Sequence, residues 1–156
     1  MRALAIICLI LTSTCALAES TLPEGCQPLA VQGESVTVKA KKNKLVFIHN
    51  LAATDLWITH PVTNPGASAG WTTRLQTGNW SALSVEKGPF VLNCIESKPG
   101  HEQAIPCEGA LAVCQWKGVK MPKSTVQGTF WAAEDMSLQA LTAAIGSRGF
   151  VLPQPK

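Results

Sequence analysis

Residues 1–18 constrain this chain most, because they decide the compartment in which it folds. Arg2 precedes a short apolar run, Ala3–Leu11, and small residues close on Ala16-Leu17-Ala18, as in a secretory signal peptide. The run is much shorter than the roughly 20 residues of a membrane-spanning helix. We therefore expect cleavage after Ala18, no membrane span afterwards, and a mature protein that is periplasmic, secreted or surface-associated.

Export decides how the cysteines are interpreted. Four of the six cysteines remain after cleavage: Cys26, Cys94, Cys107 and Cys114. An even number in an exported chain predicts two disulfides, for which three pairings are possible. Cys94 and Cys107 flank the turn signal Lys98-Pro99-Gly100, and a symmetric hairpin would set them opposite each other. We favour Cys94–Cys107, which leaves Cys26–Cys114.

A metal site is the rival interpretation of the same cysteines. Cys94, His101, Cys107 and Cys114 could supply four ligands, but they lack the C-x2-C spacing typical of zinc sites. We expect neither a metal nor another cofactor.

Short strand-like segments separated by turn residues dominate the mature chain. After an irregular segment, 19–34, they cover 35–40, 44–50, 55–60, 71–76, 80–85, 89–97, 110–116 and 125–131. Turns about every 8–12 residues favour an antiparallel β-sandwich or a barrel-like domain. We expect one disulfide-stapled, mostly β domain over 35–152 and a frayed tail, 153–156.

One short helix is expected near the C-terminus. Asp135 can cap a helix whose apolar residues recur at helical spacing, and Gly146 suits its end. The apolar residues are Met136, Leu138, Leu141, Ala144 and Ile145. The helix would pack on the sheets or cover an open end.

Charge is sparse and weakly basic, with a formal net charge of +3 and 15% charged residues. The one basic cluster is Lys39, Lys41, Lys42 and Lys44. We interpret it as a solvated turn between strands, with an anionic docking patch as the alternative. Nucleic acid is not expected as a partner, because phosphate binding requires a larger basic stripe.

Two motifs raise the possibility of catalysis. Residues 66–70 match G-x-S-x-G around Ser68, but no buried strand leads in and no helix follows, so we expect a small-residue loop. His49 and His60 lie at the ends of neighbouring strand-like segments, and we expect structural histidines. A hydrolase using Ser68, or a metal held by the two histidines, is the alternative. We assign no catalytic residue.

The segment 64–79 is the predicted partner-binding face. In the sequence, Trp71 is closely followed by three residues with planar polar side chains, Arg74, Gln76 and Asn79. Exposed aromatics beside such groups are typical of protein hot spots and glycan sites. The alternative places Trp71 in the core.

Several stretches together resemble the enhanced-entry protein B family. They are His49-Asn50-Leu51, residues 55–60, 67–71, 79–83 and 94–103, Val113-Cys114-Gln115-Trp116 and residues 129–138. The resemblance extends over 44–152. It implies an exported envelope protein of intracellular Gram-negative pathogens that is linked to host-cell entry or intracellular survival. It brings no catalytic residues to this chain.

The expected function is therefore binding by a non-enzymatic exported domain, with an envelope protein or a glycan as the partner. One alternative is a structural envelope accessory without a ligand. The other is a small hydrolase or metal-binding protein.

Overall fold

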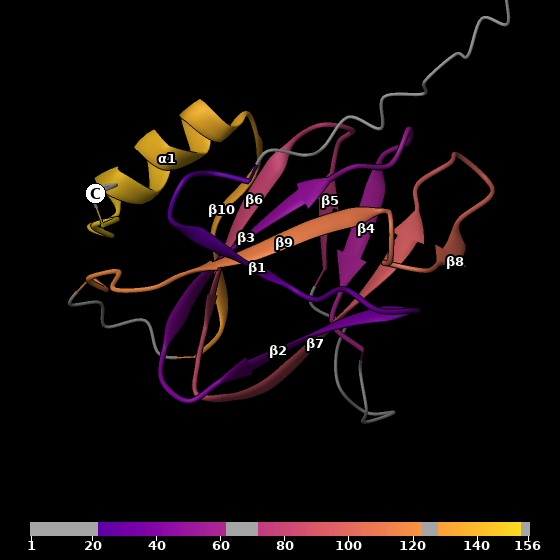
Figure 1. Ribbon diagram of the computed structural model, residues 1–156. Coiled ribbons are helices and arrows are strands. Elements are labelled where there is room, and N and C mark those ends of the chain that lie inside the picture. The colour runs from indigo at the N-terminus through magenta and orange to yellow at the C-terminus, as the bar shows by residue number, and fades with distance from the viewer. Residues whose placement is uncertain (1–21, 62–71, 123–127, 154–156) are drawn as a thin grey trace, which may run out of the picture.

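The computed structural model describes residues 22–61, 72–122 and 128–153, and Figure 1 shows its strands and its helix. The described strands are β1 (Cys26–Leu29), β2 (Ser35–Ala40), β3 (Lys44–Asn50), β4 (Leu56–Thr59), β5 (Thr72–Leu75), β6 (Trp80–Val85), β7 (Gly88–Glu96), β8 (Gln103–Ile105), β9 (Leu111–Trp116) and β10 (Phe130–Met136). One helix, α1 (Leu138–Ser147), follows them. No helix in the described ranges has the length and apolar character to cross a membrane.

The strands form two antiparallel sheets. The first sheet has the order β1-β9-β3-β6-β10. The second has the order β2-β7-β4-β5, and β8 pairs with the end of β7. The mostly β, antiparallel fold is confirmed, and it is a sandwich of two sheets rather than a closed barrel.

The core between the sheets follows from strand alternation. Val36 and Val38 of β2 are buried, whereas Thr37 and Lys39 between them are exposed. Successive side chains of a strand point to opposite faces, so one face of β2 packs inward and the other meets water. Val46 and Ile48 of β3 pack in the same cluster from the first sheet.

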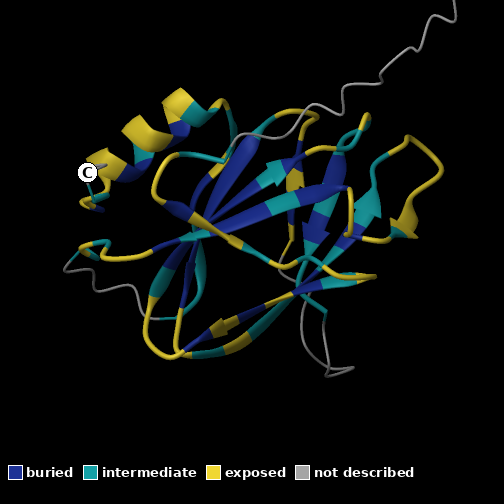
Figure 2. Ribbon diagram, viewed as in Figure 1, coloured by how far each residue is buried: buried dark blue, intermediate teal, exposed yellow. Residues whose placement is uncertain are grey.

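The first sheet is buried on both faces, which makes it the middle layer. Leu45 and Phe47 of β3 point away from the second sheet and pack in a cluster with Leu141 and Ile145 of α1. Figure 2 shows the buried stripe of the helix turned toward the sheet and its exposed stripe turned outward. Two-sided burial explains why β3 is a continuous apolar run, Leu45-Val46-Phe47-Ile48, rather than an alternating one.

Both predicted disulfides are confirmed. Cys26–Cys114 joins β1 to β9 across neighbouring strands, and Cys94–Cys107 lies in the core between the sheets. The sulfurs of these cysteines are therefore committed to disulfides, which removes the rival four-ligand metal site. Two disulfides are typical of a protein outside the reducing cytoplasm.

Three elements differ from the sequence prediction. Segment 19–34 is not wholly irregular, because its residues 26–29 form β1, the edge strand that pairs with β9. β8 is an additional three-residue strand, which pairs with β7 next to the Cys94–Cys107 bridge. β10 begins at Phe130 and is bulged against β6, so it lies later than the predicted 125–131.

The predicted helix is present, but its ends differ. Asp135 does not cap it; Ser137 does, accepting a hydrogen bond from the Ala140 N–H at 3.3 Å. Gly146 lies inside the helix, and the left-handed Gly149 (φ +86°) follows the C-cap instead. Asp135 is used elsewhere, because its carboxylate faces the loop after β5.

Candidate functional site

The predicted partner-binding face is described only in part. Trp71, Ser68 and the G-x-S-x-G motif lie outside the described residues. Arg74 lies on β5 and forms an ion pair with Asp55. Asp55 also accepts the Thr77 N–H at 3.1 Å, and these two hydrogen bonds lower the pKa of its carboxyl group. Arg74 is therefore engaged in an intramolecular ion pair, although its side chain is 53% exposed.

Gln76 and Asn79 meet at the Asp135 carboxylate. It accepts hydrogen bonds from the Gln76 N–H (2.8 Å), the Gln76 Nε2 (2.9 Å) and the Asn79 Nδ2 (2.9 Å). The Asp135 N–H donates to Ser81 Oγ at 2.9 Å. The structure brings the two predicted binding residues together, but it employs them in a cross-link between the end of β5 and β10. Their role toward a partner stays a prediction.

The two histidines stand in separate structural settings. His49 of β3 stacks on Trp80 at 4.0 Å between ring centroids, and its Nε2 lies 3.2 Å from the Gly78 carbonyl oxygen. His60 stacks on Phe90, and its Nδ1 lies 2.7 Å from the Val91 carbonyl oxygen. Over the described ranges, no group of three His, Cys, Asp or Glu side chains could hold a metal ion.

A shallow hollow of about 250 Å³ lies on the outer face of the second sheet. It is lined by Trp57, Thr59, Thr72, Ile95 and Glu102. Trp57 pairs in register with Arg74, so this hollow adjoins the predicted partner-binding face. The one charged side chain in its described lining is that of Glu102, so the described residues carry no excess of charge that would favour a particular ligand.

A cluster of positively charged side chains lies at one end of the first sheet. There, a hollow of about 590 Å³ opens beside the β2–β3 turn. Its cationic residues are Lys39, Lys41, Lys42, Lys44 and Lys117, and its apolar residues are Leu45, Trp116, Val119 and Met121. We call this hollow the lysine pocket. Asn43, Gln115 and Gly118 complete the described lining.

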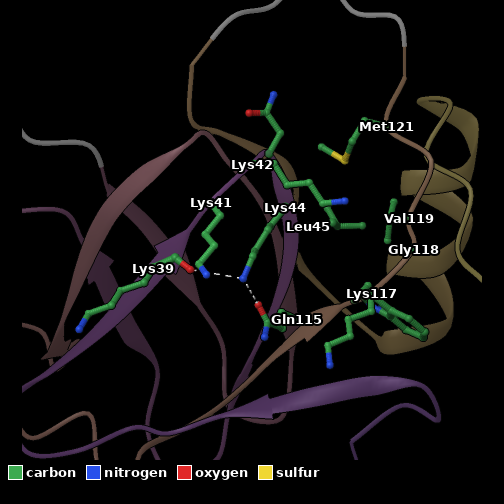
Figure 3. Close-up of a pocket in the computed structure, with 12 residues that line it drawn as sticks. Lys39, Lys41, Lys42, Lys44, Leu45, Gln115, Lys117, Gly118, Val119 and Met121 are labelled. Carbon is green, nitrogen blue, oxygen red and sulfur yellow. Dashed lines mark hydrogen bonds between the residues drawn. The ribbon is translucent and has the colours of Figure 1, made fainter.

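Strand pairing assembles the lysine pocket from distant segments, as Figure 3 shows. β3 pairs with β9 with Val46 opposite Gln115, so the start of β3 lies beside the end of β9. Lys44 Nζ donates to Gln115 Oε1 and, at 3.3 Å, to the Lys39 carbonyl oxygen. Lys117 follows directly on the last residue of β9. This pairing brings Lys117 into the lining of the same hollow as the lysines of the turn, although the two segments are far apart in the sequence.

No described acidic side chain balances the positive charge of the lysine pocket. The described residues that line it include no Asp or Glu. The ion pairs found across the described part of the chain are Arg74–Asp55 and Lys98–Glu96, and neither includes a pocket lysine. Five like charges around one hollow repel one another and attract anions.

The floor of the lysine pocket is apolar. Leu45 is fully buried and Trp116 is 8% exposed, while Val119 and Met121 are half-buried. The Trp116 Nε1–H is buried and has no acceptor among the described residues. α1 packs against β6 and β10, and it contributes no described residue to the lining. The described lining of the pocket therefore lies beside the helix and not beneath it.

The sequence shows four of the five lysines as one cluster and offers an anionic docking patch only as the alternative to a solvated turn. Nothing local places Lys117 or an apolar floor beside them. A signal is present in Trp116-Lys117, an aromatic and a cation at the end of a predicted strand. It becomes informative only with the β3–β9 pairing.

Comparison with known proteins adds no assignment to this geometry. No protein-family model, no curated protein and no solved structure matches the chain. The resemblance to the enhanced-entry protein B family therefore stays a prediction, and the lysine pocket is the candidate site on its geometry and charge.

Proposed function

We propose that this chain is an exported envelope protein that binds an anionic partner in the lysine pocket. The observation that carries the proposal is the set of five lysines around an apolar floor, with no acidic side chain among the described lining residues. Export is supported by the signal-like N-terminus and by the two disulfides. A link to host-cell entry or intracellular survival rests on the family resemblance.

The lining favours binding over hydrolysis. A hydrolytic site needs a nucleophile beside a general base, or a metal with an open position. The described lining of the lysine pocket contains no Ser, Thr, Cys, His, Asp or Glu. What it offers is ammonium groups and apolar surface, which can hold a ligand in place.

The proposal predicts an interaction that salt weakens. Ammonium groups at the rim are exposed, and ions screen such charges over a Debye length of about 10 Å at 0.1 M salt. Each bound anionic group relieves the repulsion among the lysines. Affinity should therefore fall steeply as ionic strength rises.

Isothermal titration with inositol hexakisphosphate tests the proposal on the mature chain. The test variant Lys41→Gln/Lys42→Gln removes two charges from the pocket. The control Lys98→Gln/Arg148→Gln removes the same charge from residues outside it. We expect saturable binding by wild type and control, and at least about tenfold weaker binding by the test variant. No binding by wild type, or equal weakening in both variants, would contradict the proposal.

A further inference from the structure

We infer that the partner of the lysine pocket is an anionic phospholipid presented by a membrane surface. The lysines would hold its phosphate group, and the apolar floor would receive the upper part of an acyl chain. This inference rests on the proposed function and names the ligand class of the same site. Three properties of the pocket support it: its floor, its size and the kind of cation at its rim.

The apolar floor of the lysine pocket offers a contact surface that a purely polar anion would not use. Val119 and Met121 are half-buried and Trp116 is 8% exposed, so these three present the apolar surface below the lysines, over the fully buried Leu45. A free phosphate or a sugar phosphate would satisfy the ammonium groups and leave this surface uncovered. Each methylene group that an acyl chain buries there would raise the affinity about fourfold. A ligand with both an anionic and an apolar part therefore matches the whole pocket.

The volume of the lysine pocket is large enough for part of an amphiphilic ligand. A volume of about 590 Å³ is several times what a phosphate group fills, and it lies in the range of sites for whole small molecules. The pocket is bounded by a turn and a loop at the surface of the domain, as Figure 3 shows, so a lipid could enter it without leaving its bilayer.

The cations are all lysines, and Lys41 and Lys42 stand exposed at the tip of the β2–β3 turn. Lysine is a point charge on a flexible apolar stem, so it can follow a mobile headgroup while its stem covers apolar surface. Clusters of four to eight basic residues are typical of anionic lipid recognition. A glycan would require directional amide groups. Of the two amides here, Gln115 already accepts from Lys44.

Vesicle co-flotation of the full mature chain tests the inference. Vesicles of phosphatidylcholine with about 30 mol% phosphatidylglycerol are compared with pure phosphatidylcholine. Lys41→Gln/Lys42→Gln should weaken binding to the anionic vesicles about 30-fold, since each lysine near a charged surface contributes about fivefold. Lys98→Gln/Arg148→Gln should bind as wild type.

A floor variant separates a lipid from any other anion. Met121→Gln keeps the length of the side chain and makes it polar. Val119→Thr keeps the shape of the side chain and replaces a methyl group with a hydroxyl group. Both should weaken vesicle binding about tenfold and leave affinity for inositol hexakisphosphate unchanged. The control Leu51→Gln changes an exposed leucine (40% exposed) just beyond the opposite end of β3 and should alter neither.

The outcomes distinguish the two proposals. Binding of inositol hexakisphosphate without binding of anionic vesicles would overturn the lipid inference and leave the proposed function standing. Vesicle binding that the floor variants and Leu51→Gln weaken equally would also overturn the lipid inference. If neither the soluble phosphate nor the vesicles bind, both proposals fall. Equal binding to both kinds of vesicle would show an apolar surface without headgroup recognition, which contradicts the inference.

Discussion

Asp135 is predicted to be a major stabilising link between the two sheets. Its carboxylate, on β10 of the first sheet, accepts two hydrogen bonds from Gln76, directly after β5 of the second sheet, and one from Asn79, directly before β6. Its backbone is left-handed, with φ at +49°, which costs a residue with a side chain about 1 kcal/mol. The hydrogen bonds must therefore offset a strained backbone.

The magnitude follows from these contacts. A hydrogen bond to a charged group contributes about 1.5–3 kcal/mol when buried, and less where water can replace it. Two of the three bonds are exposed and one is partly buried. Asp135→Ala should therefore lower the free energy of unfolding by about 2–4 kcal/mol.

A second substitution separates the carboxylate from the backbone. Asp135→Gly also removes the three hydrogen bonds, but glycine adopts a positive φ without strain, so it should cost about 1 kcal/mol less than Asp135→Ala. Urea unfolding followed by tryptophan fluorescence measures both. The exposed neighbour Glu134→Ala is the control and should change the stability by less than about 0.5 kcal/mol. If Asp135→Ala matches Glu134→Ala, the cross-link is not a stabilising feature and the reasoning is wrong.

Three further predictions concern stability. Burial lowers the pKa of His49 below its usual 6.5, so His49 takes up a proton more readily in the unfolded chain than in the folded one. The free energy of unfolding should therefore drop as the pH falls from about 7 to 5. In urea titrations, His49→Gln should reduce this dependence on pH. Cys94→Ser or Cys107→Ser should each cost about 2–5 kcal/mol, and the double variant no more than either single one; wild type should show no free thiol in denaturant. Ser137→Ala should cost about 1 kcal/mol by uncapping α1, whereas no loss in thermal unfolding would contradict the cap.

The parts of the fold that sequence predicts well are those with a strong local pattern. β2, β3 and β6 match the predicted bounds, because each is an apolar or alternating segment closed by turn residues at both ends. β1 and β8 are not predicted, since strands of four and three residues are too short to show a periodic pattern. Pairing with β9 and β7 makes them strands.

The candidate site depends more on long-range structure. The lysines of the β2–β3 turn are visible in the sequence, but their joining with Lys117 and the apolar floor depends on the register of β3 against β9. Asp135 illustrates the same limit. Beside an apolar helical pattern it resembles a cap, and only the folded chain brings it to Gln76 and Asn79.

The most direct test of the central claim is an NMR titration of the ¹⁵N-labelled mature protein with inositol hexakisphosphate. We predict that shift changes concentrate at Lys41, Lys42 and Lys117 and at the indole N–H of Trp116, and that about 0.3 M salt reverses them. Changes that concentrate instead at Arg74, Gln76 and Asn79, or that follow exposed lysines without regard to the pocket, would contradict the assignment of the lysine pocket as the binding site.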